Sequence, residues 1–171
     1  MIFRLATLQD LPRLKDMYRR IITYLDEVDM QIWDEHYPCE LLEGDVEKRQ
    51  LYIMAQGDTP VAAFALCPSG AGEHCVEWEN PDASALYLER LGVDTAYMRN
   101  GLASRMLQKA MEVTKEQGRE YLRLFAAISN PPSLALYRKN GFRQAVGVFD
   151  EVIDENWIIS EYGFEIRVKE T

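Results

Sequence analysis

Residues 97–107, YMRNGLASRML, combine a turn signal with the start of a helix, and the rest of the fold can be read outward from them. The pair Asn100-Gly101 favours a tight turn, and the helical pattern begins immediately after it. Amides at the start of a helix carry partial positive charge, so a loop that runs straight into a helix can bind a phosphate through its backbone. A plain strand-to-helix turn is the alternative interpretation. Helical spacing directs four apolar residues inward: Leu102, Met106, Ala110 and Val113.

The segments around this helix predict a β-α-β unit. ALYLERLGVD (85–94) and YLRLFAAI (121–128) have strand composition, and the helix separates them. We therefore expect two parallel, neighbouring strands. A short helix follows at 130–141, NPPSLALYRKNG, with Asn130 as its cap and Gly141 just past its end.

The rest of the chain alternates strands and helices. The pattern predicts a first strand, a helix capped by Asp10, a second helix near 39–50, a hairpin over 51–67 and a long loop at 68–84. Two closing strands are expected in 142–152 and 156–168. Without a linker, repeat or low-complexity run, residues 1–171 are expected to form one α/β (α+β) domain with a mixed sheet flanked by helices.

Charge and composition exclude several classes of protein. Apolar residues make up 47% of the chain and charged residues 27%, which is typical of a globular domain. The formal net charge of −9 disfavours nucleic acid and anionic membranes as partners and mildly favours cationic ones. The N-terminus lacks a signal-peptide core, so we expect a cytoplasmic protein. Three cysteines without a CxxC spacing predict neither disulfides nor a metal site.

Two motifs together resemble the GNAT superfamily of acyl-CoA-dependent N-acyltransferases: LGVDTAYMRNGLASRML and, after it, SNPPSLALYRKNGF. The resemblance implies a twisted sheet whose parallel fourth and fifth strands splay apart, with acetyl-CoA between them. The pantetheine arm would pair with the backbone near Leu91 and Val93, and Asn130 would contact the cofactor. Met98 departs from the motif, which has Gln or Arg at that position. The pyrophosphate would lie on the amides of Arg99, Asn100, Gly101, Leu102, Ala103 and Ser104.

Acylation of an amine needs two groups that handle protons. An alkyl amine has a pKa of about 10.4 and must lose a proton before it attacks, while the departing thiolate benefits from a nearby acid. The resemblance makes Tyr137 the acid, with core packing of its ring as the alternative. The family's strand glutamate is replaced by Tyr87, so Glu89 is the candidate base, unless a water chain serves instead or Glu89 is only a solvated carboxylate. A bulge in this strand would change which way Glu89 faces.

The acceptor amine is expected to meet aromatic and acidic side chains. Rings and carboxylates together can hold a cation, although the same rings could simply pack over the core. The predicted acceptor residues are Tyr24, Trp33, Asp34, Tyr37 and Tyr87, with Trp78 as a further candidate.

These expectations combine into one functional hypothesis: a cytoplasmic N-acetyltransferase that moves an acetyl group from acetyl-CoA to a primary amine of a small molecule or peptide, by direct attack in a ternary complex. The alternatives are a catalytically weak acyl-CoA sensor and a protein-interaction module. A homodimer is compatible with the sequence, which identifies neither the acceptor nor the acyl length.

Overall fold

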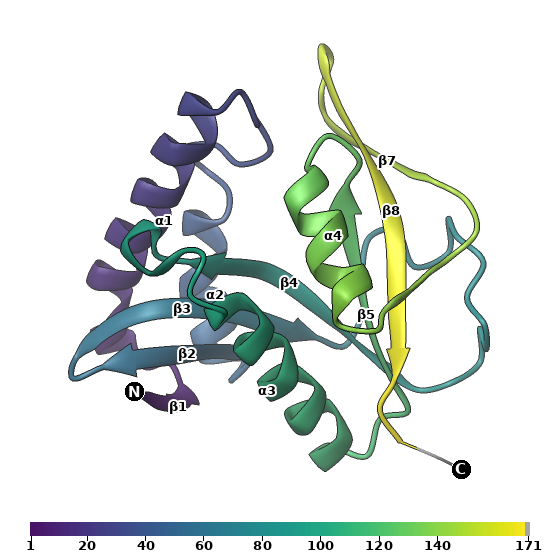
Figure 1. Cartoon of the computed structure of the whole chain (residues 1–171), viewed down its shortest axis with the longest axis horizontal. Helices are drawn as coiled ribbons and strands as arrows, with labels where there is room; N and C mark the ends of the chain where they lie inside the picture. The colour runs from purple at the N-terminus through teal and green to yellow at the C-terminus, as the bar shows by residue number, and fades with distance from the viewer. Residues whose placement is uncertain (170–171) are drawn as a thin grey trace. The chain divides into compact units, whose positions relative to one another are not determined.

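One mixed sheet organises the protein, in a computed structural model that describes residues 1–169 (Figure 1). The strand order is β1-β2-β3-β4-β5-β8-β6, and β7 pairs with β8. The strands are β1 Ile2–Leu5, β2 Leu51–Gln56, β3 Thr59–Cys67, β4 Ala85–Val93, β5 Tyr121–Ala127, β6 Arg143–Gln144, β7 Phe149–Asp154 and β8 Trp157–Arg167. The helices are α1 Leu11–Glu27, α2 Leu42–Glu47, α3 Leu102–Glu116 and α4 Pro131–Lys139, with 3-10 turns at Leu8–Asp10, Cys39–Leu41 and Thr95–Tyr97.

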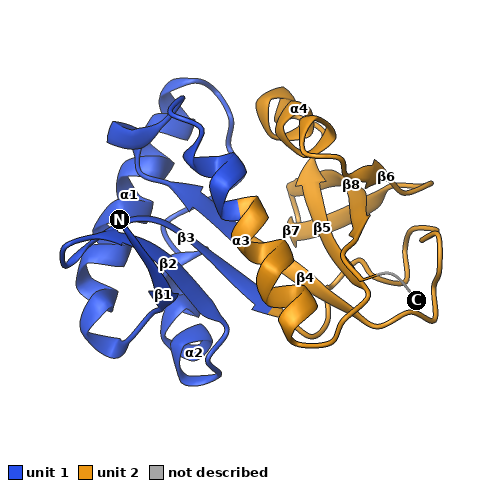
Figure 2. Cartoon of the chain, turned by 60° about the horizontal axis from the view of Figure 1, so that its bottom comes forward, with its two compact units in different colours: residues 1–66, 90–106 blue, residues 67–89, 107–171 orange. Residues whose placement is uncertain are grey.

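The chain divides into two compact units (Figure 2). Unit 1 contains Met1–Leu66 and Arg90–Met106, and unit 2 contains Cys67–Glu89 and Leu107–Thr171. The boundary between them falls next to the last residue of β3, inside β4 and inside α3. No helix in the part of the chain that the structure describes is long and apolar enough to cross a membrane.

In unit 1, α1 buries an apolar face that includes Leu14, Met17 and Tyr18. Asp10 occupies the N-cap position of α1, as predicted, but its side chain makes no capping hydrogen bond to the helix. A 3-10 turn precedes the helix, and the Asp10 carboxylate accepts the Thr7 N–H at 2.7 Å instead. The same carboxylate forms an ion pair with Arg4 at 2.7 Å. Asp10 therefore ties β1 to the start of α1.

In unit 2, β4 and β5 are parallel neighbours, as the β-α-β pattern predicts. Their pairing covers only 85–88 and 121–124; from Phe125 onward β5 continues its pairing with β8. Asn130 caps α4 by accepting the Ser133 N–H at 3.3 Å. Helix α4 ends before Gly141, whose φ is +88°.

The first closing strand is interrupted, which the sequence did not predict. Instead of one strand over 142–152, β6 and β7 pair with different parts of β8. Gly147 lies between them with φ +105°, a conformation that residues with a side chain rarely adopt. Next to it, Val146 makes an isolated bridge with Glu77. The left-handed glycine turns the chain and divides the expected strand into two.

Candidate active site

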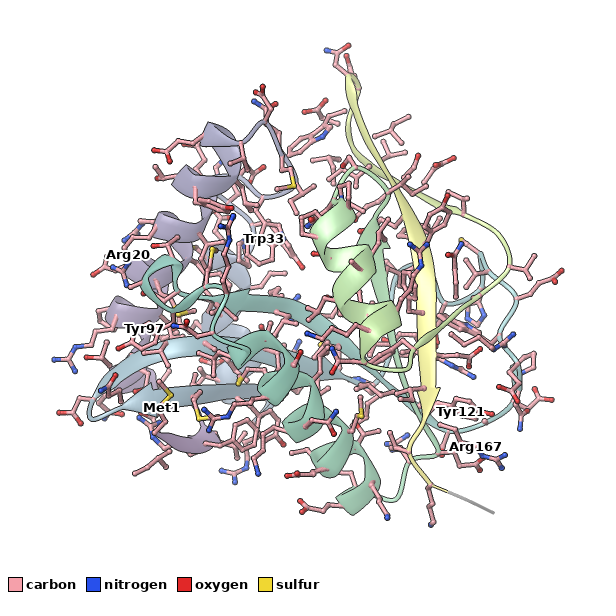
Figure 3. The ribbon with its side chains drawn as sticks, in the orientation of Figure 1. Met1, Arg20, Trp33, Tyr97, Tyr121 and Arg167 are labelled. Atoms are coloured by element: carbon pink, nitrogen blue, oxygen red, sulfur yellow. The ribbon has the colours of Figure 1, made fainter. Side chains whose placement is uncertain are left out.

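The turn before α3 has the backbone shape that an anion site needs. Its 3-10 entry is capped by Asp94, which accepts the Ala96 N–H at 3.0 Å and pairs with Arg20 at 2.5 Å (Arg20 is labelled in Figure 3). Arg99 and Gly101 both have left-handed backbones, with φ of +64° and +75°. The Arg105 N–H donates to Gly101 O at 3.1 Å, which is the first hydrogen bond of the helix. The amides of 102–104 precede this bond, so they have no acceptor within the helix.

Space around this turn is open. A Cβ on Gly101 would meet no atom within 4 Å, and Arg99 and Asn100 are exposed. Leu102 differs from its neighbours because its side chain is buried in the core, so only its amide is available to a ligand. The residues predicted to bind phosphate therefore form one continuous turn within unit 1, with room for an anion beside it.

The end of β4 that carries Leu91 and Val93 also belongs to unit 1. Both side chains are half-buried. Arg90, just before them, has φ +57°, so the strand is irregular where the sequence analysis anticipated a bulge. For this reason, side chains after Glu89 need not continue the regular alternation between the two faces of β4.

Tyr137 is buried in unit 2, where its ring lies 5.8 Å from the rings of both Phe142 and Phe164. Burial raises the pKa of the Tyr137 phenol, and the negative charge of Glu89 raises it further. The phenol therefore keeps its proton at neutral pH. The carboxylate predicted to be the base thus lies near the phenol predicted to be the acid.

A carboxyl pair that the sequence analysis missed lies on the hairpin formed by β7 and β8. Glu161 lies opposite Phe149 on β7 and Ala127 on β5, and Glu151 is two residues further along β7. Burial raises the pKa of Glu161 to about 8, with further contributions from the charges of Glu151 and Glu89 and from a hydrogen bond with Glu151. That hydrogen bond lowers the pKa of Glu151, although burial raises it overall. Near neutral pH, Glu161 is therefore mostly protonated, and its O–H donates a hydrogen bond to the Glu151 carboxylate.

Four of the five predicted acceptor residues belong to unit 1, and all four are half-buried. The Asp34 carboxylate is already engaged, because it accepts the N–H groups of His36 at 2.8 Å and Tyr37 at 2.7 Å. Trp33, labelled in Figure 3, packs edge-on against Tyr18 with ring centroids 5.6 Å apart. Tyr24 lies on α1.

The fifth residue, Tyr87, lies in unit 2 and lines a cavity of about 430 Å³ beside the 68–84 loop. Trp78 and Arg123 line the same cavity. Arg123 is buried, stacks on the Trp78 ring at 4.7 Å, and lies 3.4 Å from Glu165, its partner across β5 and β8. Burial raises the pKa of the Tyr87 phenol.

Comparison with known proteins identifies the family. The sequence profile described as "Acetyltransferase (GNAT) family" matches residues 13–142, which include the turn before α3, the end of β4 and all of α4. The chain belongs to the GNAT acetyltransferase family. The resemblance seen in the sequence is thereby confirmed, together with the expected enzyme class, an acyltransferase.

Individual relatives are more distant. The chain is 35% identical over 75 residues to a mycothiol acetyltransferase of Clavibacter sepedonicus, an alignment that covers 44% of this chain but only 24% of that protein. In structure it is similar to the ribosomal-protein-S18-alanine N-acetyltransferase of Escherichia coli, with a TM-score of 0.71, 15% identity, and coverage of 99% of this chain and 95% of that one. YncA of Salmonella typhimurium, solved with acetyl-CoA, gives a TM-score of 0.73 at 13% identity, with coverage of 100% and 95%. The structural likenesses confirm the mixed α/β fold with its parallel β4–β5 pair.

Proposed function

We propose that this GNAT protein is an acetyl-CoA-dependent N-acetyltransferase that acetylates a primary amine of a small molecule or peptide by direct attack. The observation that carries the proposal is the turn over 97–104: two left-handed residues, Arg99 and Gly101, lead directly into α3, and the space beside Gly101 is open. A turn of this shape suits the pyrophosphate of the acyl donor, because backbone amides at a helix start bind anions without needing a lysine. The net charge of −9 disfavours binding of an anionic ligand, so a site that binds phosphate through main-chain amides offsets this repulsion locally.

In this proposal the amides of 99–104 hold the pyrophosphate, and the exposed Arg99 adds positive charge at the rim. The backbone at Leu91 and Val93 pairs with the pantetheine arm. Asn130 contacts the donor from the start of α4 while keeping its role as helix cap.

Glu161 is the best-suited base in the described part of the chain. Its pKa of about 8 lies close to the pH at which an enzyme works, which is the condition for efficient proton transfer. Glu89, the base expected from the sequence, has a supporting role in this proposal, because its charge raises the pKa of both Glu161 and Tyr137. Three carboxyl groups that influence one another also favour a cationic acceptor, such as an alkylammonium.

Proton transfer begins from the deprotonated form of Glu161, whose population grows as the pH approaches 8. This carboxylate takes a proton from the ammonium, the freed nitrogen lone pair forms a bond to the thioester carbonyl carbon, and the carbon–sulfur bond breaks. The sulfur leaves as a thiolate and receives a hydrogen bond or proton from the Tyr137 phenol. The second proton of the attacking amine passes to solvent as the amide forms, and solvent returns a proton to the Tyr137 phenolate and takes the proton held by Glu161. The products are an acetamide and free CoA.

Titration calorimetry with acetyl-CoA, CoA and dephospho-CoA tests donor binding, and thiol release across a panel of amines tests turnover. We expect micromolar binding of acetyl-CoA and thiol release with at least one amine. Gly101→Glu, which adds bulk and negative charge at the turn, should weaken binding at least about 30-fold. Gly118→Glu is the matched control, since Gly118 has φ +74°, is exposed, and follows the opposite end of α3.

Each outcome has a distinct meaning. Equal affinity in the two glycine variants would remove the turn as the phosphate site. Acetyl-CoA binding without turnover on any amine would favour the acyl-CoA sensor. The absence of both binding heat and thiol release would contradict the acyltransferase proposal. That result would favour a protein-interaction module.

A further inference from the structure

The irregular point of β4 is held by unusually specific contacts. Arg90 adopts φ +57° inside a strand, a conformation that costs free energy for a residue with a side chain and persists only where its surroundings enforce it. The enforcing contacts come from α1 and α2, and all of the residues involved belong to unit 1.

The first contact acts on the backbone. The Tyr18 hydroxyl donates a hydrogen bond of 2.6 Å to the carbonyl oxygen of Arg90. Tyr18 is fully buried, and burial raises the pKa of its phenol, so the hydroxyl remains a donor over the physiological range. Gly92 allows the approach, because a Cβ at that position would lie 2.9 Å from the Tyr18 ring. Tyr18 on α1 thus holds β4 at the carbonyl group of Arg90, the residue with the left-handed backbone.

The second contact acts on the side chain. The Arg90 guanidinium forms a bidentate ion pair with Asp45 on α2, with both nitrogen–oxygen distances at 2.8 Å. Each side chain is only 7% exposed. The ring of Tyr37 lies 5.8 Å from the guanidinium carbon. A buried ion pair adds little net stability compared with an apolar substitute of the same size, so its value here lies in the geometry that it imposes.

We propose that Tyr18 and Asp45 are positioning residues that hold β4 at Arg90 in the shape that presents the backbone of 91–93 to the acyl donor. The inference rests on the proposed function. Two anchors from different helices hold the carbonyl and the guanidinium of one residue, and together they fix the direction in which the strand leaves Arg90. Relaxation toward a regular strand would rotate the peptide groups of 91–93 and misalign them with the pantetheine arm.

The test compares Tyr18→Phe and Asp45→Asn with the parent protein, using calorimetric affinity for acetyl-CoA and the separate values of kcat and KM. We expect the affinity to fall and KM for acetyl-CoA to rise by about 5- to 20-fold, with kcat changed by less than about twofold, because the lost contacts align the bound donor and do not take part in proton transfer.

Matched controls separate positioning from general destabilisation. Asp10 is buried like Asp45, at 6% and 5% exposure, and also forms a bidentate pair, with Arg4 at 2.7 and 2.9 Å. Tyr121 is a buried tyrosine of β5, at 2% exposure. We expect Asp10→Asn and Tyr121→Phe to leave KM near the parent value, even where thermal unfolding shows a loss of stability.

Several results would overturn the inference. A parent-like KM in Tyr18→Phe and Asp45→Asn would overturn the inference and leave the proposed function intact. An equal rise of KM in the Asp10→Asn control would have the same meaning. If Asp45→Asn fails to fold, Tyr18→Phe, which removes one hydroxyl, decides the question alone. A parent protein that binds no acetyl-CoA would remove the proposed function and this inference together.

Discussion

The turn before α3 and the carboxyl pair of the β7–β8 hairpin represent two ways of building a site. The turn offers main-chain amides, and its shape follows from consecutive residues, with left-handed backbones at Arg99 and Gly101. Glu151 and Glu161 offer side chains whose chemistry depends on strand pairing and burial. A main-chain site can be recognised in a short sequence. A site that depends on shifted side-chain pKa values arises only when the chain has folded.

This difference predicts two kinds of mutational response. Changes at the turn should alter affinity for the acyl donor, because we propose that its amides bind the phosphate. Changes at the carboxyl pair and Tyr137 should alter turnover, because we propose that these groups transfer protons.

Replacing the proposed base should have the largest effect. Glu161→Gln keeps the size and hydrogen-bonding capacity of the side chain but cannot take a proton, so kcat should fall by about 100- to 1,000-fold. Affinity for acetyl-CoA should stay within about twofold. Steady-state kinetics and calorimetry measure the two quantities. Glu155→Gln, in the exposed turn between β7 and β8, is the control. A Glu161→Gln enzyme with parent-like kcat would return the base assignment to Glu89 or to water.

Removing the phenol of Tyr137 should have the next largest effect. Tyr137→Phe retains the ring that packs against Phe142 and Phe164, so the fold should survive. Loss of the proton donor should lower kcat by about 10- to 50-fold while donor affinity remains near the parent value. The reduction should shrink when the thioester leaving group is made more acidic, because a better leaving group needs less assistance. Equal rates in mutant and parent would eliminate the acid role.

Stability should depend on pH through Glu161. Its pKa in the folded protein, about 8, lies above the ordinary value of 4.5, so between these values the folded state retains a proton that the unfolded state has released. Stability is therefore greatest at low pH in this window and falls as pH rises toward 8, by about 1–3 kcal/mol for a half-buried group. Thermal unfolding from pH 5 to 9 measures the trend. Glu161→Gln should flatten it, and an unchanged slope would contradict the raised pKa.

The smallest effect is expected at the rim of the turn. Arg99 is exposed, so Arg99→Gln should weaken acetyl-CoA binding only about two- to fivefold, and the difference should diminish at high salt. The main-chain amides would remain in place. Calorimetry at two salt concentrations tests this expectation. A loss as large as that expected for Gly101→Glu would mean that side-chain charge, not backbone, dominates the site.

Much of the fold follows from the pattern of residues along the chain. Periodicity predicted α1 and α3, the β2–β3 hairpin and the parallel β4–β5 pair, because each depends on the spacing of apolar residues along a short segment. The cap at Asn130 was predicted for the same reason, since a cap involves residues three apart. The predictions that failed involve competition with other parts of the chain. Arg4 and Thr7 draw Asp10 away from its expected role, and the bridge from Val146 to Glu77 lies where β6 and β7 separate.

Local features follow from short segments of the chain: the turn at Asn100-Gly101, the amphipathic helix after it and the two motifs typical of the family. The proton shared by Glu151 and Glu161 and the contacts that hold Arg90 in its left-handed conformation arise only in the folded protein. Glu161 acquires its pKa of about 8 from burial and from charges on two other strands. Arg90 is held by Tyr18, 72 residues away along the chain, and by Asp45, 45 residues away. Desolvation and charge act through space, so no short window of sequence contains them.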